Sequence, residues 1–239
     1  MTTLDDRPSI AVSTVIFTLQ PNESGEPELR IPLVRRIREP FADLWALPGG
    51  PLAQTEDLAD SASRTLRETT GLEPRYLEQL YAFGDPARSP GERVVSIVYW
   101  ALVGGDEAGQ VFDSENVAWF RADDLPELAF DHNLIVDYAL WRLRTKLEYS
   151  RIAHGFLGDT FTLAQLREVY EVILQRPIDP GNFRRTMEAS GTVVATGERL
   201  TGTPHRPPQL YRYNAEPTAS NEFDLGPLSH RVLTAKESA

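Results

Sequence analysis

The chain has 239 residues, 41% of them hydrophobic and 25% charged, a composition typical of a soluble globular protein with one large or two ordinary domains. It contains no cysteine, which excludes disulfides and thiolate zinc sites, and its four histidines lie at spacings that no metal-binding motif uses. No apolar run approaches the roughly 18 residues of a membrane span, and the polar N-terminus lacks the pattern of a signal peptide. A cytoplasmic protein with no membrane partner is therefore the default expectation.

The formal net charge of -11 is unevenly distributed along the chain. Residues 1–130 contain 11 arginines and 22 acidic residues, whereas residues 131–239 contain 13 basic and 13 acidic residues. Within the second part, residues 176–212 carry six arginines and three acidic residues. This asymmetry favours two modules with different partners, although so small a local excess of positive charge is also common on ordinary surfaces.

The first 130 residues alternate between strand and helix patterns. β-Branched and apolar runs bounded by turn residues predict strands at 9–18, 29–36, about 75–83, 93–103 and 117–120. Between the second and third strands, residues 55–70 have apolar side chains at helical spacing. Thr55 is a plausible N-cap of that helix, and Gly71 is a plausible left-handed C-cap. The order predicts an α+β or α/β domain over residues 1–130.

The remaining chain is mainly helical until two short strands near its end. Apolar spacing predicts a linker helix over residues 131–153, with the helical pattern beginning at Asn133. The following patterns predict helices at 161–174 and 180–190 and strands at 193–196 and 209–213. Together these elements predict a winged helix-turn-helix domain over 154–215. Asp179 and Pro180 supply a cap and a first helical residue for the second of these helices, and Gly191 ends it. Residues 216–239 are polar and aperiodic, which predicts a flexible tail.

Residues 45–72 resemble the signature of the Nudix hydrolase family, which reads G-x5-E-x7-R-E-U-x-E-E-x-G-U, with U an aliphatic residue. The positions that fall in register are Gly50, Glu56, Arg64, Leu66, Glu68, Gly71 and Leu72. The resemblance implies a Nudix-fold mixed-sheet sandwich in which the helix of the signature borders a nucleotide site.

The departures from this signature carry the functional argument. Thr65 and Thr69 stand where the family has glutamates, and these two positions share one helix face with Glu68. In an active member that face presents three carboxylates to metal ions that bridge a pyrophosphate. The single carboxylate left on this face carries too little negative charge to bind the usual set of metal ions. We therefore expect hydrolysis to be lost or very weak, no cofactor to be required and Mg²⁺ binding to be weakened. The alternative is harmless drift in an enzyme that uses carboxylates elsewhere.

The candidate ligand residues lie in and around this signature. Arginines suit phosphate recognition because the guanidinium group binds oxygens in a bidentate manner, and an aromatic ring at Trp45 or Phe41 suits stacking on a base. The full candidate set is Arg36, Arg38, Trp45, Gly50, Glu56, Glu68 and Arg88. An arginine at a strand end, an aromatic core residue and an ordinary surface loop around Arg88 are equally good interpretations of the weaker members.

The helix predicted at 180–190 has an apolar side and a polar side that suit a reader of the DNA major groove. Arginine can bind guanine, and asparagine can bind adenine, through paired hydrogen bonds. The candidate DNA-binding residues are Asn182, Arg184 and Arg185 on this helix, and Arg199 and Arg206 in or beside the wing loop. A solvated charged face on an interaction domain is the alternative.

Taken together, the two halves resemble the Nudix-related transcriptional regulators of the NrtR type, through the segments FDHNLIVDYAL, FTLAQLREVYEVIL, DPGNFRRTM and LYRY. The resemblance implies a homodimer that binds a palindromic double-stranded DNA operator as a repressor of NAD-metabolism genes. It also implies ADP-ribose or a related nucleotide as the effector. The second hypothesis is an active hydrolase of ADP-ribose or another nucleoside diphosphate derivative, and a third, less favoured, is a structural adaptor.

Overall fold

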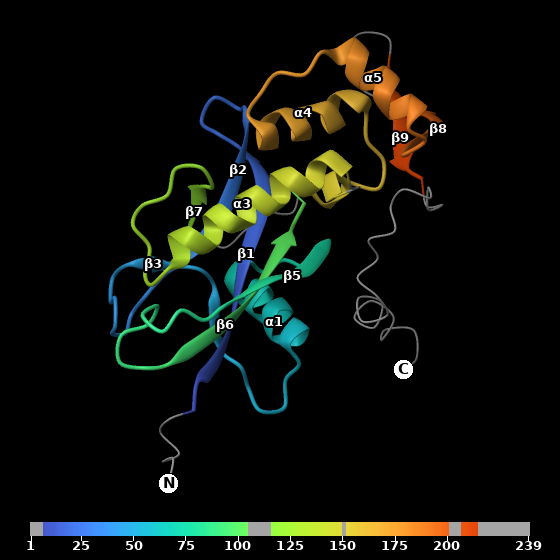
Figure 1. The fold of residues 1–239 in the computed structure, drawn as a ribbon. Coiled ribbons are helices and arrows are strands. Elements are labelled where there is room, and N and C mark those ends of the chain that lie inside the picture. The colour runs from blue at the N-terminus through green and yellow to red at the C-terminus, as the bar shows by residue number, and fades with distance from the viewer. Residues whose placement is uncertain (1–6, 105–115, 150–151, 201–206, 215–239) are drawn as a thin grey trace. The chain divides into compact units, whose positions relative to one another are not determined.

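A computed structural model describes residues 7–104, 116–149, 152–200 and 207–214 (Figure 1). The chain divides into two compact units, Met1–Arg142 and Leu143–Ala239. The predicted wing loop around Arg206 and the predicted tail 216–239 lie outside the described residues. Within the described part, no helix is both long and apolar enough to cross a membrane.

The first unit is built on one mixed sheet, to which seven strands of the described residues contribute. These strands are β1 Ser9–Pro21, β2 Pro27–Arg35, β3 Trp45–Ala46, β4 Gly49–Pro51, β5 Tyr76–Phe83, β6 Val94–Leu102 and β7 Val117–Arg121. The main path has the order β3-β2-β1-β6-β5, while β4 pairs with β1 and β7 pairs with β2. Strands β1 and β6 are parallel, and the other pairs are antiparallel. The predicted mixed sheet is therefore confirmed.

Helix α1 (Leu58–Thr70) ends as its sequence predicts but begins later than expected. Gly71 has φ 69°, a left-handed conformation that glycine adopts at little cost, and it closes the helix. The predicted N-cap, Thr55, is wrong because the backbone N–H of Glu56 bonds the carbonyl of Ala53 and places Thr55 in a turn. Asp57 occupies the N-cap position instead.

The central strands bury both faces, which makes the unit a layered sandwich. On one face, Val12 and Ile16 of β1 pack with Ala62 and Leu66 of α1. Helix α3 (His132–Tyr149) lies against the other face, where the ring of its Tyr138 is 5.7 Å from that of Tyr81 on β5. These two faces follow from the two-residue alternation of side chains along a strand.

The second unit contains a short 3₁₀-helix (Ile152–Phe156), helix α4 (Leu163–Leu174), helix α5 (Pro180–Ala189) and the hairpin β8 (Val193–Arg199) and β9 (Gln209–Tyr213). Thr162 and Gln165 form a capping box at the start of α4. Asp179 accepts a bond from the backbone N–H of Asn182, and Pro180 is the first helical residue, as predicted. This order of two helices and a hairpin is that of a winged helix.

Aromatic and aliphatic side chains from every element of the second unit form its core. The ring of Phe183 on α5 packs edge-on against Tyr170 on α4, with 5.3 Å between centroids. Phe161 and Tyr211 are joined by two backbone hydrogen bonds, which attach the hairpin to the segment before α4. Because Phe183 is buried, the opposite side of α5 faces solvent.

Candidate functional site

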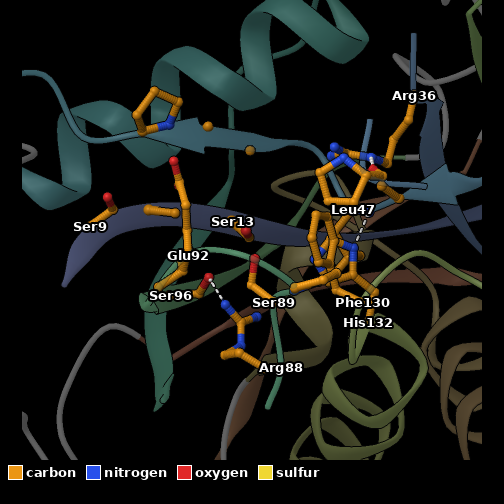
Figure 2. A pocket seen from close by; sticks show the side chains of 18 of the residues that line it. Ser9, Ser13, Arg36, Leu47, Arg88, Ser89, Glu92, Ser96, Phe130 and His132 are labelled. Carbon is orange, nitrogen blue, oxygen red and sulfur yellow. Dashed lines mark hydrogen bonds between the residues drawn. The ribbon is translucent and has the colours of Figure 1, made fainter. Parts of the chain in front are cut away.

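The first unit contains a cavity of about 660 Å³, a volume in the ordinary range for small-molecule sites. Its walls come from five places: the start of β1, the segment from Arg36 to Pro51, the loop 88–92, the start of β6 and the residues Phe130 and His132. Figure 2 shows Arg36, Phe130 and His132 gathered at one end, and Ser9 and Glu92 at the other. No residue of α1 contributes to the lining.

Gly49 allows β4 to approach β1 closely enough to form one wall of the cavity. A Cβ atom at this position would lie 2.6 Å from the carbonyl oxygen of Val12 and 2.7 Å from Oγ of Ser13. Gly50, the next residue and a predicted ligand residue, also lines the cavity, but an added Cβ there would meet nothing within 4 Å. The first glycine of the pair is therefore required by packing, and the second is not.

Arg36 and Phe130 form a stacked pair at one end of the cavity. The guanidinium carbon of Arg36 lies 4.6 Å from the ring centroid of Phe130, and its Nε donates a 2.9 Å bond to the carbonyl of Pro40. Burial lowers the pKa of Arg36, although an arginine stays charged at neutral pH. Arg38 also lines the cavity. Two of the predicted phosphate-binding residues therefore lie at the cavity.

Phe41 and Phe130 are held in an uncommon backbone conformation. Their φ angles are 66° and 60°, and their rings meet edge to face at 4.9 Å. A left-handed conformation costs a bulky residue roughly 1–3 kcal/mol, and such outliers cluster at ligand-binding sites. Phe41 contacts Phe130 but does not line the cavity itself.

His132 is a buried histidine whose hydrogen bond defines its tautomer. Its Nδ1 accepts a 3.0 Å bond from the backbone N–H of Leu47, and the residue is only 6% exposed (Figure 2). Burial lowers the pKa of His132 to about 4; the positive charges of Arg88 and Arg36 lower it further, against an opposing effect of Asp131. The ring is therefore neutral at physiological pH, with its proton on Nε2.

Arg88 connects the loop 88–92 to the start of α3. Its Nε and Nη2 donate bonds of 2.9 and 2.6 Å to the two carboxylate oxygens of Asp131, and its Nη1 donates a 2.7 Å bond to Oγ of Ser96. The side chain of Arg88 is 4% exposed. Arg88 lines the cavity as expected of a ligand residue, but its guanidinium already binds this protein carboxylate in a bidentate manner.

Three of the predicted ligand residues do not line the cavity. Trp45 packs edge-on against Phe120, with 5.1 Å between ring centroids. Glu56 and Glu68 are both bound by Arg64, whose Nε lies 2.7 Å from Glu56 and whose Nη1 lies 3.1 Å from Glu68. The hydrogen bond from Arg64 holds the pKa of Glu56 below its ordinary value.

The residues at the Nudix signature do not fit a divalent cation. Thr65 is buried, Thr69 carries no charge, and Glu68 is paired with Arg64. Over residues 7–104, 116–149, 152–200 and 207–214, no group of three histidine, aspartate or glutamate side chains is placed to share a metal ion. Mg²⁺ needs several hard oxygen ligands, and the helix of the signature offers too few of them to hold the ion.

Helix α5 presents the predicted DNA-binding side chains on its exposed side. Asn182, Arg184 and Arg185 are all exposed, and an Nη2 of Arg185 donates a hydrogen bond to Oδ1 of Asn182. Nε of Arg184 donates a 3.0 Å bond to Glu188, which also accepts a 2.9 Å bond from the hydroxyl of Tyr211.

On the hairpin, Nη1 of Arg199 donates a 2.8 Å bond to the carbonyl of Pro207. Arg199 is therefore tied to the other side of the wing loop. Arg206 lies outside the described residues.

Several residues at the cavity are not predicted by the sequence. Phe130, Asp131 and His132 are consecutive, and nothing in their spacing distinguishes them from an ordinary helix start. Their partners, Leu47, Arg88 and Ser96, are far away in the chain. One signal is present, because the segment FDHNLIVDYAL, which carries part of the family resemblance, contains Phe130 and His132.

The two units define a protein that combines a Nudix fold with a winged helix, and comparison with known families agrees. Residues 10–138 match the NUDIX domain, and residues 153–213 match the NrtR DNA-binding winged helix domain. The NrtR of Shewanella oneidensis, solved in complex with a 27mer DNA, is 34% identical, and the match covers 86% of this chain and 93% of that one, with a TM-score of 0.75.

Two curated relatives are similar at the sequence level. The ADPR responsive transcriptional repressor NtrR of Acinetobacter baylyi is 34% identical over 86% of this chain and 82% of its own length. An ADP-ribose pyrophosphatase of Methanocaldococcus jannaschii is 34% identical over 56% of this chain and 75% of its own length. The chain belongs to the NrtR family of Nudix-related transcriptional regulators.

Proposed function

We propose that this protein is a transcriptional repressor that binds DNA through α5 and releases it when ADP-ribose fills the cavity of the Nudix unit. The observation that carries the proposal is the presence of both sites in one chain: a cavity with Arg36 and His132 at one end, and an exposed Asn182–Arg185 pair on α5. The similarity to an ADPR responsive repressor over 86% of the chain supports both partners.

The physical properties of the cavity suit a ribose diphosphate. Arg36 provides positive charge for phosphates at one end, and Ser9 and Glu92 at the other can bond hydroxyl groups. Arg38 adds a second positive charge to the lining. ADP-ribose is NAD without its nicotinamide, so a protein that senses it reports on NAD breakdown. We therefore propose that the regulated genes belong to NAD metabolism.

We propose further that the protein does not turn its ligand over. Two threonines replace signature carboxylates, and Arg64 neutralises both Glu56 and Glu68. The similarity to an ADP-ribose pyrophosphatase is the specific observation in favour of hydrolysis. Release of AMP from ADP-ribose with Mg²⁺, at about 1 per second or faster, would establish the competing activity.

A homodimer on a palindromic operator follows if two copies each present one α5 to the DNA. Half-sites then lie about one helical turn, or a multiple of it, apart. Analytical ultracentrifugation of the free protein tests whether it is a dimer. Footprinting of the complex tests whether the operator has two half-sites, and a single unpaired half-site would contradict the proposal.

The test of the main proposal begins with selection of bound sites from random DNA by the full-length protein. Gel-shift titration of the selected site then measures the dissociation constant with and without ADP-ribose. We expect saturating ADP-ribose to weaken DNA binding at least about 5-fold, the lower end of ordinary allosteric coupling. An unchanged dissociation constant would contradict the proposal.

The reading helix is tested in the same assay with Arg185→Ala. We expect about 10-fold or greater loss of affinity for the selected site, because a bidentate arginine–guanine contact contributes strongly to discrimination. Arg67→Ala removes an arginine from the exposed face of α1 and is the matched control for the change in charge. Equal effects of the two substitutions would show that α5 does not read the sequence.

A further inference from the structure

His132 lines the cavity of the proposed function, which gives its ring no contact with the ligand. Its Nδ1 is occupied by the backbone N–H of Leu47, yet the ring lines the cavity. The two ring nitrogens point in different directions in the plane of the imidazole, so Nε2 is not the atom that faces Leu47. Within the described residues, the imidazole of His132 makes its hydrogen bond through Nδ1 alone. The Nε2–H group is therefore a hydrogen-bond donor on a ring that lines the space a ligand would fill.

The surroundings of His132 indicate which part of a ligand would meet this donor. The ring centroids of His132 and Phe130 are 5.4 Å apart, and Phe130 carries the guanidinium of Arg36 on its face. The positive charge of Arg36 is close enough to lower the pKa of His132. A neutral N–H donor and a cation at the same end of a cavity are complementary to a phosphate oxygen.

We propose that Nε2–H of His132 donates a hydrogen bond to a phosphate oxygen of the ligand in this cavity. The proposal rests on the proposed function, which supplies ADP-ribose as the ligand. A neutral donor has one advantage over a further arginine, because it binds a phosphate without adding positive charge beside Arg36 and Arg88.

The position of His132 in the fold gives this contact a second consequence. His132 is the first residue of α3, a single helix that continues to Tyr149 and so enters the second unit. A ligand bonded to Nε2 would therefore hold the start of that helix, while the backbone N–H of Leu47 holds the same ring through Nδ1. We expect the contact to contribute to DNA release as well as to ligand affinity.

Two amide substitutions separate the two nitrogens of the ring. In His132→Asn, the short amide reaches the place of Nδ1 and can still accept the bond from Leu47, but it cannot replace Nε2. In His132→Gln, the longer amide reaches the place of Nε2 and can donate to a ligand. The dissociation constant of ADP-ribose is measured by calorimetry for both variants, and urea unfolding measures their stability.

We expect His132→Asn to stay folded at neutral pH but to bind ADP-ribose about 10-fold to 100-fold more weakly, the usual effect of losing a hydrogen bond to a charged group. We expect His132→Gln to be less stable but to keep more of the affinity. The His132→Asn variant should also need correspondingly more ADP-ribose to release DNA. Unchanged affinity of a folded His132→Asn variant would overturn the proposal.

Two further measurements keep the result interpretable. ADP retains both phosphates, so its affinity should fall by the same factor in His132→Asn; an unaffected affinity for ADP would move the contact to the terminal ribose and overturn the phosphate assignment. In protein labelled with ¹⁵N-histidine, the Nε2–H signal of His132 should shift on addition of ADP-ribose, and an unshifted signal would contradict the contact even if the variants fail to fold. Absence of ADP-ribose binding to the unaltered protein would instead refute the proposed function.

Discussion

The neutral, buried state of His132 makes the stability of the first unit sensitive to acid. In the unfolded chain this histidine takes up a proton below about pH 6.5, its ordinary pKa, whereas in the folded chain it does so only near pH 4. The folded state is therefore fully stable above pH 6.5 with respect to this group, and it loses stability as the pH falls toward 4. Asp131 opposes the effect, while Arg88 and Arg36 add to it.

The magnitude follows from the size of the pKa shift. A shift from 6.5 to about 4 corresponds to about 3 kcal/mol in total, of which roughly 2 kcal/mol is lost between pH 7.5 and pH 5.0. Other ionisable groups add their own pH dependence to the folding of the unit. The informative quantity is therefore the difference between the unaltered protein and His132→Asn, which keeps an acceptor for Leu47 but does not titrate.

The assay is urea unfolding followed by tryptophan fluorescence at the two pH values. All four tryptophans, Trp45, Trp100, Trp119 and Trp141, lie in the first unit, so the signal reports that unit alone. We expect His132→Asn to lose about 2 kcal/mol less than the unaltered protein on acidification. His154→Asn, which removes an exposed histidine of the second unit, should behave as the unaltered protein. Equal losses in His132→Asn and the unaltered protein would refute the reasoning.

Three further substitutions test the packing around the two sites. Gly49→Ala should destabilise the first unit by about 1–3 kcal/mol, because its Cβ would lie 2.6 Å from the carbonyl oxygen of Val12. Gly50→Ala, whose Cβ would meet nothing within 4 Å, should not destabilise it. Urea unfolding followed by tryptophan fluorescence compares the stabilities of the two variants. In the same assay, Arg88→Ala should lower the free energy of unfolding by about 3–5 kcal/mol, because it leaves the carboxylate of Asp131 without its partner. A loss of stability no larger than that of Arg93→Ala, at an exposed position, would contradict this. Phe183→Ala should lower the free energy of unfolding of the second unit by about 3–5 kcal/mol, measured by far-ultraviolet circular dichroism. A smaller loss of stability than that of Thr186→Ala, at an exposed position, would show that packing of the Phe183 ring does not stabilise α5.

The elements of this fold are largely readable from local patterns. The cap at Asp179 followed by Pro180 and the left-handed Gly71 are signals within a few residues of the helix ends they determine. Thr55 is an equally good local signal but lies in a turn closed by a bond to Ala53, so the helix begins after it. Such competition between neighbouring caps is decided by backbone geometry that the sequence pattern does not contain.

The cavity is less predictable because its walls meet only in the folded unit. The chemistry of Arg36 and Arg38 identifies them as candidates, and both line it. Glu56 and Glu68 belong to the signature, but whether they face a ligand or Arg64 depends on the rotamer of the arginine. His132 is a lone histidine whose partner, Leu47, is 85 residues away, and no periodicity marks such a pair.

Helix α3 starts in the wall of the cavity and runs unbroken past Leu143, where the second unit begins. This one helix therefore belongs both to the unit with the cavity and to the unit with α5. Thermodynamic reciprocity applies to two ligands of one protein that change each other's affinity. If ADP-ribose lowers the affinity for DNA by some factor, bound DNA must lower the affinity for ADP-ribose by the same factor. A protein bound to its operator therefore binds the metabolite more weakly than a free one does. The concentration at which the cell's genes respond consequently rises with the strength of the operator.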